Sequence, residues 1–162
     1  GFLLGFNPCK PTSRGSLQIC SPDPLAAPEM HSNYLDTDYD KAVMLAGMRL
    51  MRKIAQTPAL SAVIDTELYP GVEIESDADM ADFLREKSWT VFHQCGTCRM
   101  GRDEKTSVVD EKLRVHGIGN LRIADASIFP SIPSGNTNAP AIMVGEMAAN
   151  IIKNEALMKA KR

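Results

Sequence analysis

Apolar residues recur at helical spacing in DKAVMLAGMRLMRKIAQ, residues 40 to 56. The basic residues of this stretch lie off the apolar face. Asp40 stands directly before the run and is predicted as the N-cap, and Pro58 marks the region where the helix has ended. We interpret the methionines as core packing rather than as ligands. The face consists of Val43, Met44, Gly47, Leu50, Met51 and Ile54.

Two more helices are predicted further along the chain. ESDADMADFLREKS, residues 75 to 88, has Ser76 and Asp79 spaced as a capping box. Pro140 opens a long final helix, AIMVGEMAANIIKNEALMKA, with basic residues near its end, as the helix dipole favours. Its apolar face is predicted to include Ile142, Met143, Met147, Ile151 and Met158.

Shorter segments have the pattern of β-strands. SLQICS alternates Leu17 and Ile19 with polar neighbours, and WTVFH, residues 89 to 93, is a second predicted strand. SVVD and LRVHGIGNLRIAD are strand-like too, broken by turns at His116–Gly117 and Gly119–Asn120. The chain is therefore predicted to be mixed α and β, of the α+β class.

Composition narrows the functional classes. Apolar residues make up 44% and charged residues 23% of the 162 positions, which is typical of a globular domain. The net charge of -2 gives no electrostatic case for a nucleic-acid partner, and no apolar run is long enough for a transmembrane segment.

Because the chain starts at Gly1 with no Met and no targeting segment, we expect the natural N-terminus to lie upstream. The compartment is thus poorly bounded, and we expect the cytoplasm.

The stretch HQCGTCRMG, residues 93 to 101, concentrates reactive side chains. A structural zinc site usually needs two close ligand pairs, and Cys95 and Cys98 form only one, so no metal is predicted. A redox dithiol would precede a helix, whereas RMGRDEKTS resembles a loop. We expect mostly free thiols. His93 can accept a proton near neutral pH, but from the residues alone a structural histidine is the more economical interpretation.

A second informative stretch is LRIADASIFPSIPSGNTNAP, residues 121 to 140. An apolar strand is predicted to end at Asp125, and SGNTNAP leads into the final helix. Backbone N–H groups at a helix start are unpaired and can face an electron-rich ligand. An N-cap with an Asx-turn would explain one of Asn136 and Asn138, but not both.

Together the two stretches resemble the glucose–methanol–choline (GMC) flavin oxidoreductases. HQCGTCRMG is similar to that family's His-Pro-x-Gly-Thr-Cys-x-Met-Gly signature, with Gln94 in place of the common Pro and Cys95 at a variable position. Residues 108 to 152 resemble the C-terminal signature nearly throughout, and KPTSRGSLQICSPDPLAAPEMHSNYL resembles the start of the family's C-terminal substrate domain. The resemblance covers essentially the whole chain and is strongest from residue 90 onward.

The resemblance implies a site. His93 matches the base that takes the proton of a substrate hydroxyl, and Asn136 matches a second catalytic position that would hold the developing alkoxide. Asp125 and Ala126 match a pair that contacts the FAD pyrophosphate and ribityl chain. Thr137 and Asn138 match residues that lie against the flavin ring. The implied reaction is oxidation of the CH–OH group of an alcohol, choline-like or another primary alcohol, with hydride transfer to flavin and reoxidation by oxygen or another acceptor.

The resemblance also implies a domain organisation. Residues 1–110 would form the substrate-binding domain, an antiparallel sheet flanked by helices. Residues 111–162 would supply a strand and helix that return to an FAD-binding domain. The Gly-x-Gly-x-x-Gly dinucleotide fingerprint of that domain is absent here, so we expect this chain alone to bind FAD weakly or not at all and to be inactive. A flavin-dependent lyase of the same family, and a zinc or redox module centred on Cys95 and Cys98, are alternative functions.

Overall fold

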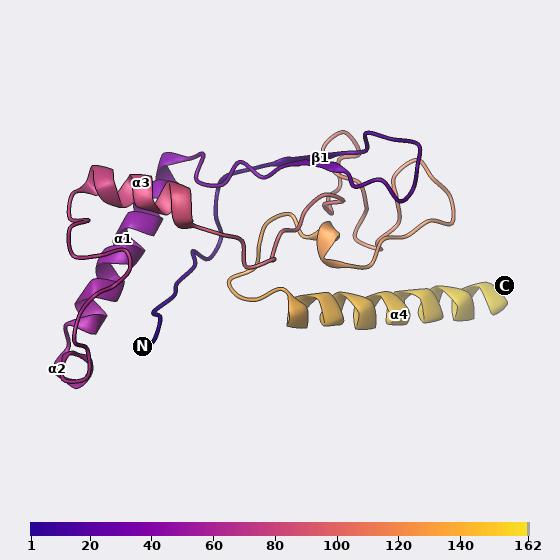
Figure 1. The fold of residues 1–162 in the computed structure, drawn as a ribbon. Coiled ribbons are helices and arrows are strands. Elements are labelled where there is room, and N and C mark those ends of the chain that lie inside the picture. Colours follow the sequence, from indigo (N-terminus) through magenta and orange to yellow (C-terminus); the bar gives the residue numbers. More distant parts are fainter. Residues whose placement is uncertain (162) are drawn as a thin grey trace. The chain divides into compact units, whose positions relative to one another are not determined.

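The computed structural model describes residues 1–161, apart from the side chain of Lys159, and forms two compact units that divide between Val91 and Phe92 (Figure 1). Four α-helices and one small antiparallel sheet of two strands make up its regular structure, so the predicted mixed class is confirmed. In this part of the chain no helix is both long and apolar enough to cross a bilayer. The predicted domains, 1–110 and 111–162, stay a prediction, because compactness alone divides the chain elsewhere.

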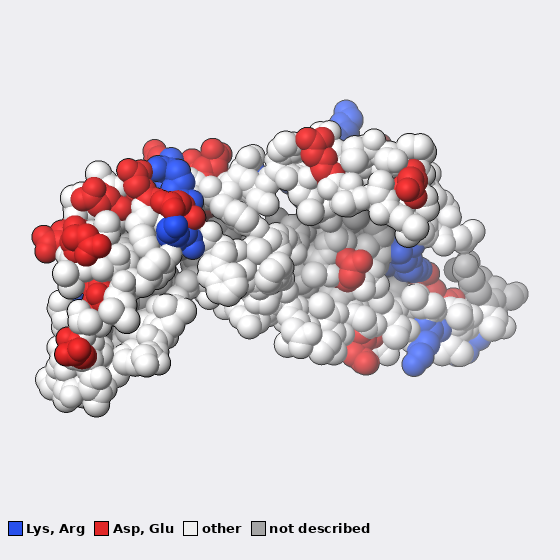
Figure 2. Space-filling view, in the orientation of Figure 1, with Lys and Arg blue, Asp and Glu red and all other residues white. Residues whose placement is uncertain are grey.

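The first unit is built around methionines. Helix α1, Asp38–Ala55, packs against α3, Asp77–Lys87, and the short α2, Pro58–Ser61, follows α1. Their shared core consists of Met44, Met48, Met80 and Leu84. Figure 2 shows acidic side chains gathered over these helices. The apolar spacing of the sequence thus predicted both helices. Of the face predicted for α1, however, only Met44 belongs to the buried core, and Met48 was missed.

The start of α1 corrects one prediction. The N-cap is Thr37, whose side chain accepts a hydrogen bond from the backbone N–H of Asp40. Asp40 lies inside the first turn and is only 2% exposed. Its carboxylate accepts bonds from the backbone N–H groups of Thr12 and Ser13, both at 2.8 Å, and from both hydroxyls. Burial alone would raise the pKa of Asp40, but these hydrogen bonds outweigh it and lower the pKa to about 2.

The other predicted boundaries of this unit are close to those observed. Ser76 caps α3 by accepting from the backbone N–H of Asp79 at 3.1 Å. Strand β1, Ser16–Gln18, pairs antiparallel with β2, Glu29–His31, so that Leu17 lies opposite Met30. The sheet is confirmed, although β1 ends before Ile19.

The second unit has one helix and a core of loops. Helix α4, Asn138–Ala160, and the 3-10 turn η1, Ala126–Ile128, pack around Val109, Leu113, Ile128, Val144 and Ala148. The predicted strands at 107–110 and 113–125 are reduced to isolated bridges, such as Val109 with Val115. The turns do occur where glycine and asparagine were found, with φ of 73° at Gly117 and 61° at Asn120. Short connections between these turns leave little length for a ladder.

Two further predictions are wrong. Residues 88–99 contain no strand in the described structure, because Phe92 has φ of 60° and interrupts the extended run. Helix α4 begins at Asn138, which places Pro140 in its first turn, where the missing N–H costs nothing. The face of α4 that packs within this unit carries Val144 and Ala148, whereas most of the predicted apolar face is exposed. Those exposed residues are Ile142, Met143, Met147 and Met158.

Candidate functional site

The loop after His93 is held by its backbone. Cys98 donates its N–H to the carbonyl of Ser127 at 3.0 Å, and Met100 donates to the carbonyl of Ile128 at 2.7 Å. Both acceptors belong to η1, which follows directly after Asp125. The two stretches that carry the sequence motifs therefore dock through main-chain hydrogen bonds, which do not depend on side-chain identity.

Gly96 allows this docking. Its φ of 93° lies in the left-handed region, which favours glycine. A Cβ at this position would lie 3.1 Å from the carbonyl oxygen of Phe129. The turn that follows His93 thus needs a residue without a side chain for two separate reasons.

His93 contacts the start of α4. Its Nδ1 lies 3.0 Å from Oγ1 of Thr137, across 44 positions of sequence. Thr137 is 9% exposed, and its carbonyl accepts the N–H of Ala141 at 2.9 Å, which begins the helix. The structure therefore places a half-buried imidazole against the first residue before a helix of 23 residues.

The N-terminus of α4 is exposed on both sides of Thr137 and lacks acidic side chains. Asn136 and Asn138, on either side of Thr137, are both exposed. Helices α1 and α3 carry two aspartates each in their first turns, whereas α4 has no acidic residue there. The partial positive charge of this helix end is thus not neutralised by its own side chains, so it can face an electron-rich group.

Asp125 and Ala126 directly precede Ser127 and Ile128, the residues that accept the main-chain hydrogen bonds of the His93 loop. Asp125 caps η1, and its carboxylate accepts the N–H of Ser127 at 2.8 Å while the residue stays exposed. Ala126 is half-buried. The structure joins this segment to the His93 loop through the main chain, and no hydrogen bond between Asp125 and His93 is found among the described residues.

The two cysteines of the loop, Cys95 and Cys98, are half-buried and are not joined in a disulfide. Among residues 1–161, no group of three or more His, Cys, Asp or Glu side chains is placed to hold a metal ion. Gln94, at the other departure from the family signature, is exposed.

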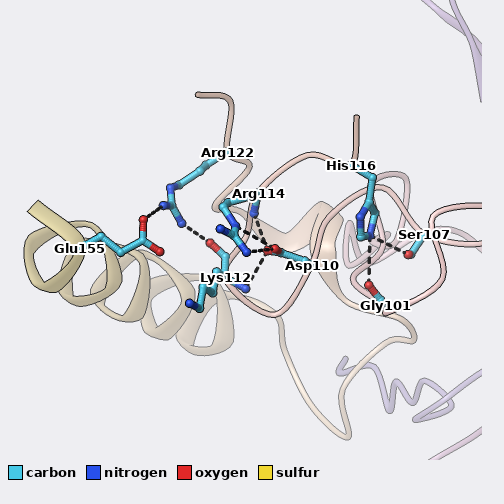
Figure 3. Close-up of polar contacts among 8 residues, drawn as sticks. All are labelled: Gly101, Ser107, Asp110, Lys112, Arg114, His116, Arg122 and Glu155. Atoms are coloured by element: carbon cyan, nitrogen blue, oxygen red, sulfur yellow. Dashed lines mark hydrogen bonds and ion pairs between the residues drawn. The ribbon is translucent and has the colours of Figure 1, made fainter. Parts of the chain in front are cut away.

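Sequence reasoning missed a polar network elsewhere in the second unit (Figure 3). Arg122 donates to Glu155 of α4 at 2.5 Å and also to the carbonyl of Lys112. Asp110 accepts from the Arg114 side chain at 2.8 Å and from two backbone N–H groups. Burial would raise the pKa of Asp110, but these bonds lower it. The spacing of Asp110 and Arg114 is the one signal that could have found this pair; nothing local links Arg122 to Glu155.

Comparison with known proteins gives consistent matches. The family model for GMC oxidoreductases matches residues 11–145. An oxygen-dependent choline dehydrogenase of Vibrio vulnificus (strain YJ016) is 39% identical over 163 residues, covering 100% of this chain and 29% of that protein. The crystal structure of pyridoxine 4-oxidase from Mesorbium loti is similar with a TM-score of 0.83 and 35% identity, over 88% of this chain and 28% of that one.

A second solved structure agrees. An FAD-dependent oxidoreductase from Chaetomium thermophilum has a TM-score of 0.86 and 32% identity, over 91% of this chain and 26% of that one. The chain spans less than a third of the length of the curated relatives it matches, 29% and 27% for two of them.

Proposed function

The chain belongs to the GMC oxidoreductase family, and from this premise we propose that it is the C-terminal part of an FAD-dependent enzyme that oxidises the CH–OH group of an alcohol. The observation that carries the proposal is the 3.0 Å contact between His93 and Thr137. It places a group able to accept a proton at the start of α4, which is free of acidic residues.

Each catalytic residue has a chemical task. His93 takes the proton from the substrate hydroxyl as the C–H bond gives up its hydride. The amide of Asn136, exposed beside Thr137, donates a hydrogen bond to the developing alkoxide. A positioned base of this kind contributes roughly 10²–10⁴-fold to the rate. The protein supplies this placement, and the cofactor supplies the electron chemistry.

FAD fits the residues that surround this helix start. When bound, it supplies the acceptor for the substrate hydride. Thr137 and Asn138 would lie against the flavin ring, and the unpaired N–H groups of the first turn of α4 would be available to an electron-rich group there. Asp125 and Ala126 would hold the chain between the ring and the pyrophosphate. Since the dinucleotide fingerprint is absent from this chain, the remaining contacts would come from elsewhere in the complete protein.

The substrate is proposed to be a cationic primary alcohol of the choline type, oxidised with oxygen or another electron acceptor. The name of the Vibrio relative, an oxygen-dependent choline dehydrogenase, supports this substrate class.

A cytoplasmic location is also proposed, and fractionation of cells that express the complete protein would test it.

Replacing His93 by Gln in the complete, FAD-loaded protein tests the function. We expect kcat/KM for the alcohol to fall about 10²–10⁴-fold while the flavin absorbance of the purified protein is retained. His116→Gln is the matched control. His116 is also half-buried in the second unit, but its Nε2 contacts the carbonyl of Gly101 and the hydroxyl of Ser107. Unchanged turnover in His93→Gln would refute the proposal.

A further inference from the structure

Thr137 is unusual among the polar residues of the described chain. Only Asp40 and Thr137 are both polar and buried there. Asp40 is accounted for by its bonds to Thr12 and Ser13, which join the N-terminal segment to α1. The Thr137 hydroxyl instead contacts the imidazole of His93. Because buried polar groups are kept where their hydrogen bonds matter, this contact calls for its own explanation.

We propose that Thr137 is a positioning residue that decides which nitrogen of His93 carries the ring proton. The proposal rests on the function given above and extends it to the orientation of the base. In a neutral imidazole one ring nitrogen is a donor and the other is an acceptor. The 3.0 Å contact between Nδ1 of His93 and Oγ1 of Thr137 is compatible with either direction of donation. In the proposed direction Nδ1–H donates to Oγ1, and Nε2 keeps the lone pair that receives the substrate proton.

The same contact suits both protonation states of the base. Before reaction Nδ1–H is the donor, and afterwards the imidazolium carries N–H groups on both nitrogens. The substrate O–H bond breaks and an Nε2–H bond forms, while the bond from Nδ1 to Thr137 is unchanged. The hydroxyl thus stabilises the positive charge that His93 acquires, without any side chain moving.

Both partners are held by rigid structure. Threonine is branched at Cβ, which restricts its side-chain rotamers, and Thr137 is fixed at the start of α4 by the bond from Ala141. The His93 loop is fixed by the main-chain bonds to Ser127 and Ile128. This arrangement gives the imidazole a set orientation rather than a range of them.

Other titratable groups lie on the elements that pack together here. They are Cys95, Cys98 and Arg99 on the His93 loop, Arg122 and Asp125 on the segment that receives it, and Glu146 in the third turn of α4. Arg122 is engaged by Glu155, and Asp125 accepts from Ser127. An Asp125→Asn variant provides the reference for any effect of the nearby carboxylate.

The first test needs no substitution at Thr137. Protein labelled with ¹⁵N at histidine would be studied by NMR in the complete, FAD-loaded enzyme, with His93→Gln used to assign the His93 resonances. The chemical shifts distinguish a protonated from an unprotonated ring nitrogen above the pH at which the ring titrates. We expect a proton on Nδ1 and a bare Nε2. A proton found on Nε2 instead would overturn the proposal.

The second test compares Thr137→Val with Thr137→Ser. Valine keeps the shape but removes the acceptor, so we expect kcat to fall about tenfold with little change in KM, the size of one lost hydrogen bond. The midpoint of the rising limb of the pH profile should move to lower pH, because the protonated ring loses its partner. Serine keeps the acceptor, so Thr137→Ser should have nearly the original kcat and the original midpoint of the rising limb.

The controls distinguish failure of the positioning role from failure of the proposed function. Ser76→Ala removes an N-cap hydroxyl from α3, where no imidazole is bonded, and should lower stability without moving the pH limb. If His93→Gln abolishes turnover but Thr137→Val leaves both the limb and the ¹⁵N shifts unchanged, the positioning role is wrong and the proposed function stands. If His93→Gln remains active, the proposed function itself fails.

Discussion

Arg122 and Glu155 lie 2.5 Å apart and join the segment before η1 to the last turns of α4. Arg122 also donates to the carbonyl of Lys112, so one guanidinium connects three parts of the second unit. The side chains are 21% and 30% exposed, and one oxygen of Glu155 is already buried without a hydrogen-bond partner among the described residues. If this ion pair is broken, little water can therefore reach the Glu155 carboxylate to take the place of Arg122 as its hydrogen-bond donor.

Arg122→Ala is expected to lower the free energy of unfolding by about 2 kcal/mol, less than the ~3–5 kcal/mol of a fully buried pair. The loss arises because the Glu155 carboxylate would remain partly buried without its partner. Urea unfolding followed by circular dichroism measures it. The control is Arg85→Ala, which breaks a pair with Asp82 whose side chains are 64% and 76% exposed. That change should cost about 0.5 kcal/mol or less, and equal losses in the two variants would contradict the prediction.

Asp40 should make the first unit sensitive to acid. Its pKa lies at about 2 in the folded chain and near 3.8 ordinarily, so its contribution is complete above about pH 4 and is lost as the pH falls toward 2. The two values correspond to about 2 kcal/mol. Asp40→Asn should lower stability at pH 7 and flatten the dependence of stability on pH between 4 and 2, as urea unfolding at several pH values would show.

Asp38→Asn is the matched control for that series. Asp38 lies one half-turn away on α1, and its side chain is fully exposed. We expect little change in either stability or its pH dependence. A pH dependence in Asp40→Asn as steep as in the unmodified chain would show that another group is responsible.

Gly96→Ala should disturb the His93 loop. Alanine is disfavoured at φ of 93°, and its Cβ would press on the Phe129 carbonyl. We expect a loss of about 1–2 kcal/mol in stability and a fall in kcat/KM of the complete enzyme. Gly119→Ala is the comparison, since a Cβ there would meet no atom within 4 Å. If both substitutions have the same effect, the close approach to Phe129 is not what requires glycine.

The proposed choline-type substrate gives a prediction about salt. If acidic side chains of the complete enzyme attract a cationic alcohol, KM for choline should rise with salt, because screening weakens the attraction. KM for a neutral primary alcohol of similar size should stay nearly constant. Steady-state kinetics of the complete enzyme at low and high ionic strength would compare the two. Parallel behaviour of both alcohols would remove this argument for a choline-type substrate.

Local patterns predicted the helices well and their tertiary connections poorly. The capping by Ser76 and the helical spacing around Met44 depend on residues a few positions apart, which the sequence displays directly. Asp40 was misassigned because a carboxylate before an apolar run resembles an N-cap. Its true partners, Thr12 and Ser13, are 28 and 27 positions away. No local rule brings them together.

The second unit shows the same limit at its strands and its helix. The run WTVFH was predicted as an apolar strand, but the left-handed backbone of Phe92 cannot be foreseen from its side chain. Helix α4 is apolar around most of its circumference, so its periodicity could not identify the face that packs on Val109 and Leu113. The contact of His93 with Thr137 depends on tertiary structure, and the sequence indicated it only through resemblance to a family.

The loop after His93 is anchored through peptide groups, while the side chains of Gln94, Thr97 and Arg99 are exposed. A mutation at an exposed side chain such as Thr97 would therefore leave these main-chain bonds in place. Selection for a new substrate could act on exposed positions of this loop while the proton-accepting group is inherited intact. Such independence would help to explain how one scaffold came to serve proteins as different as a choline dehydrogenase and a pyridoxine oxidase.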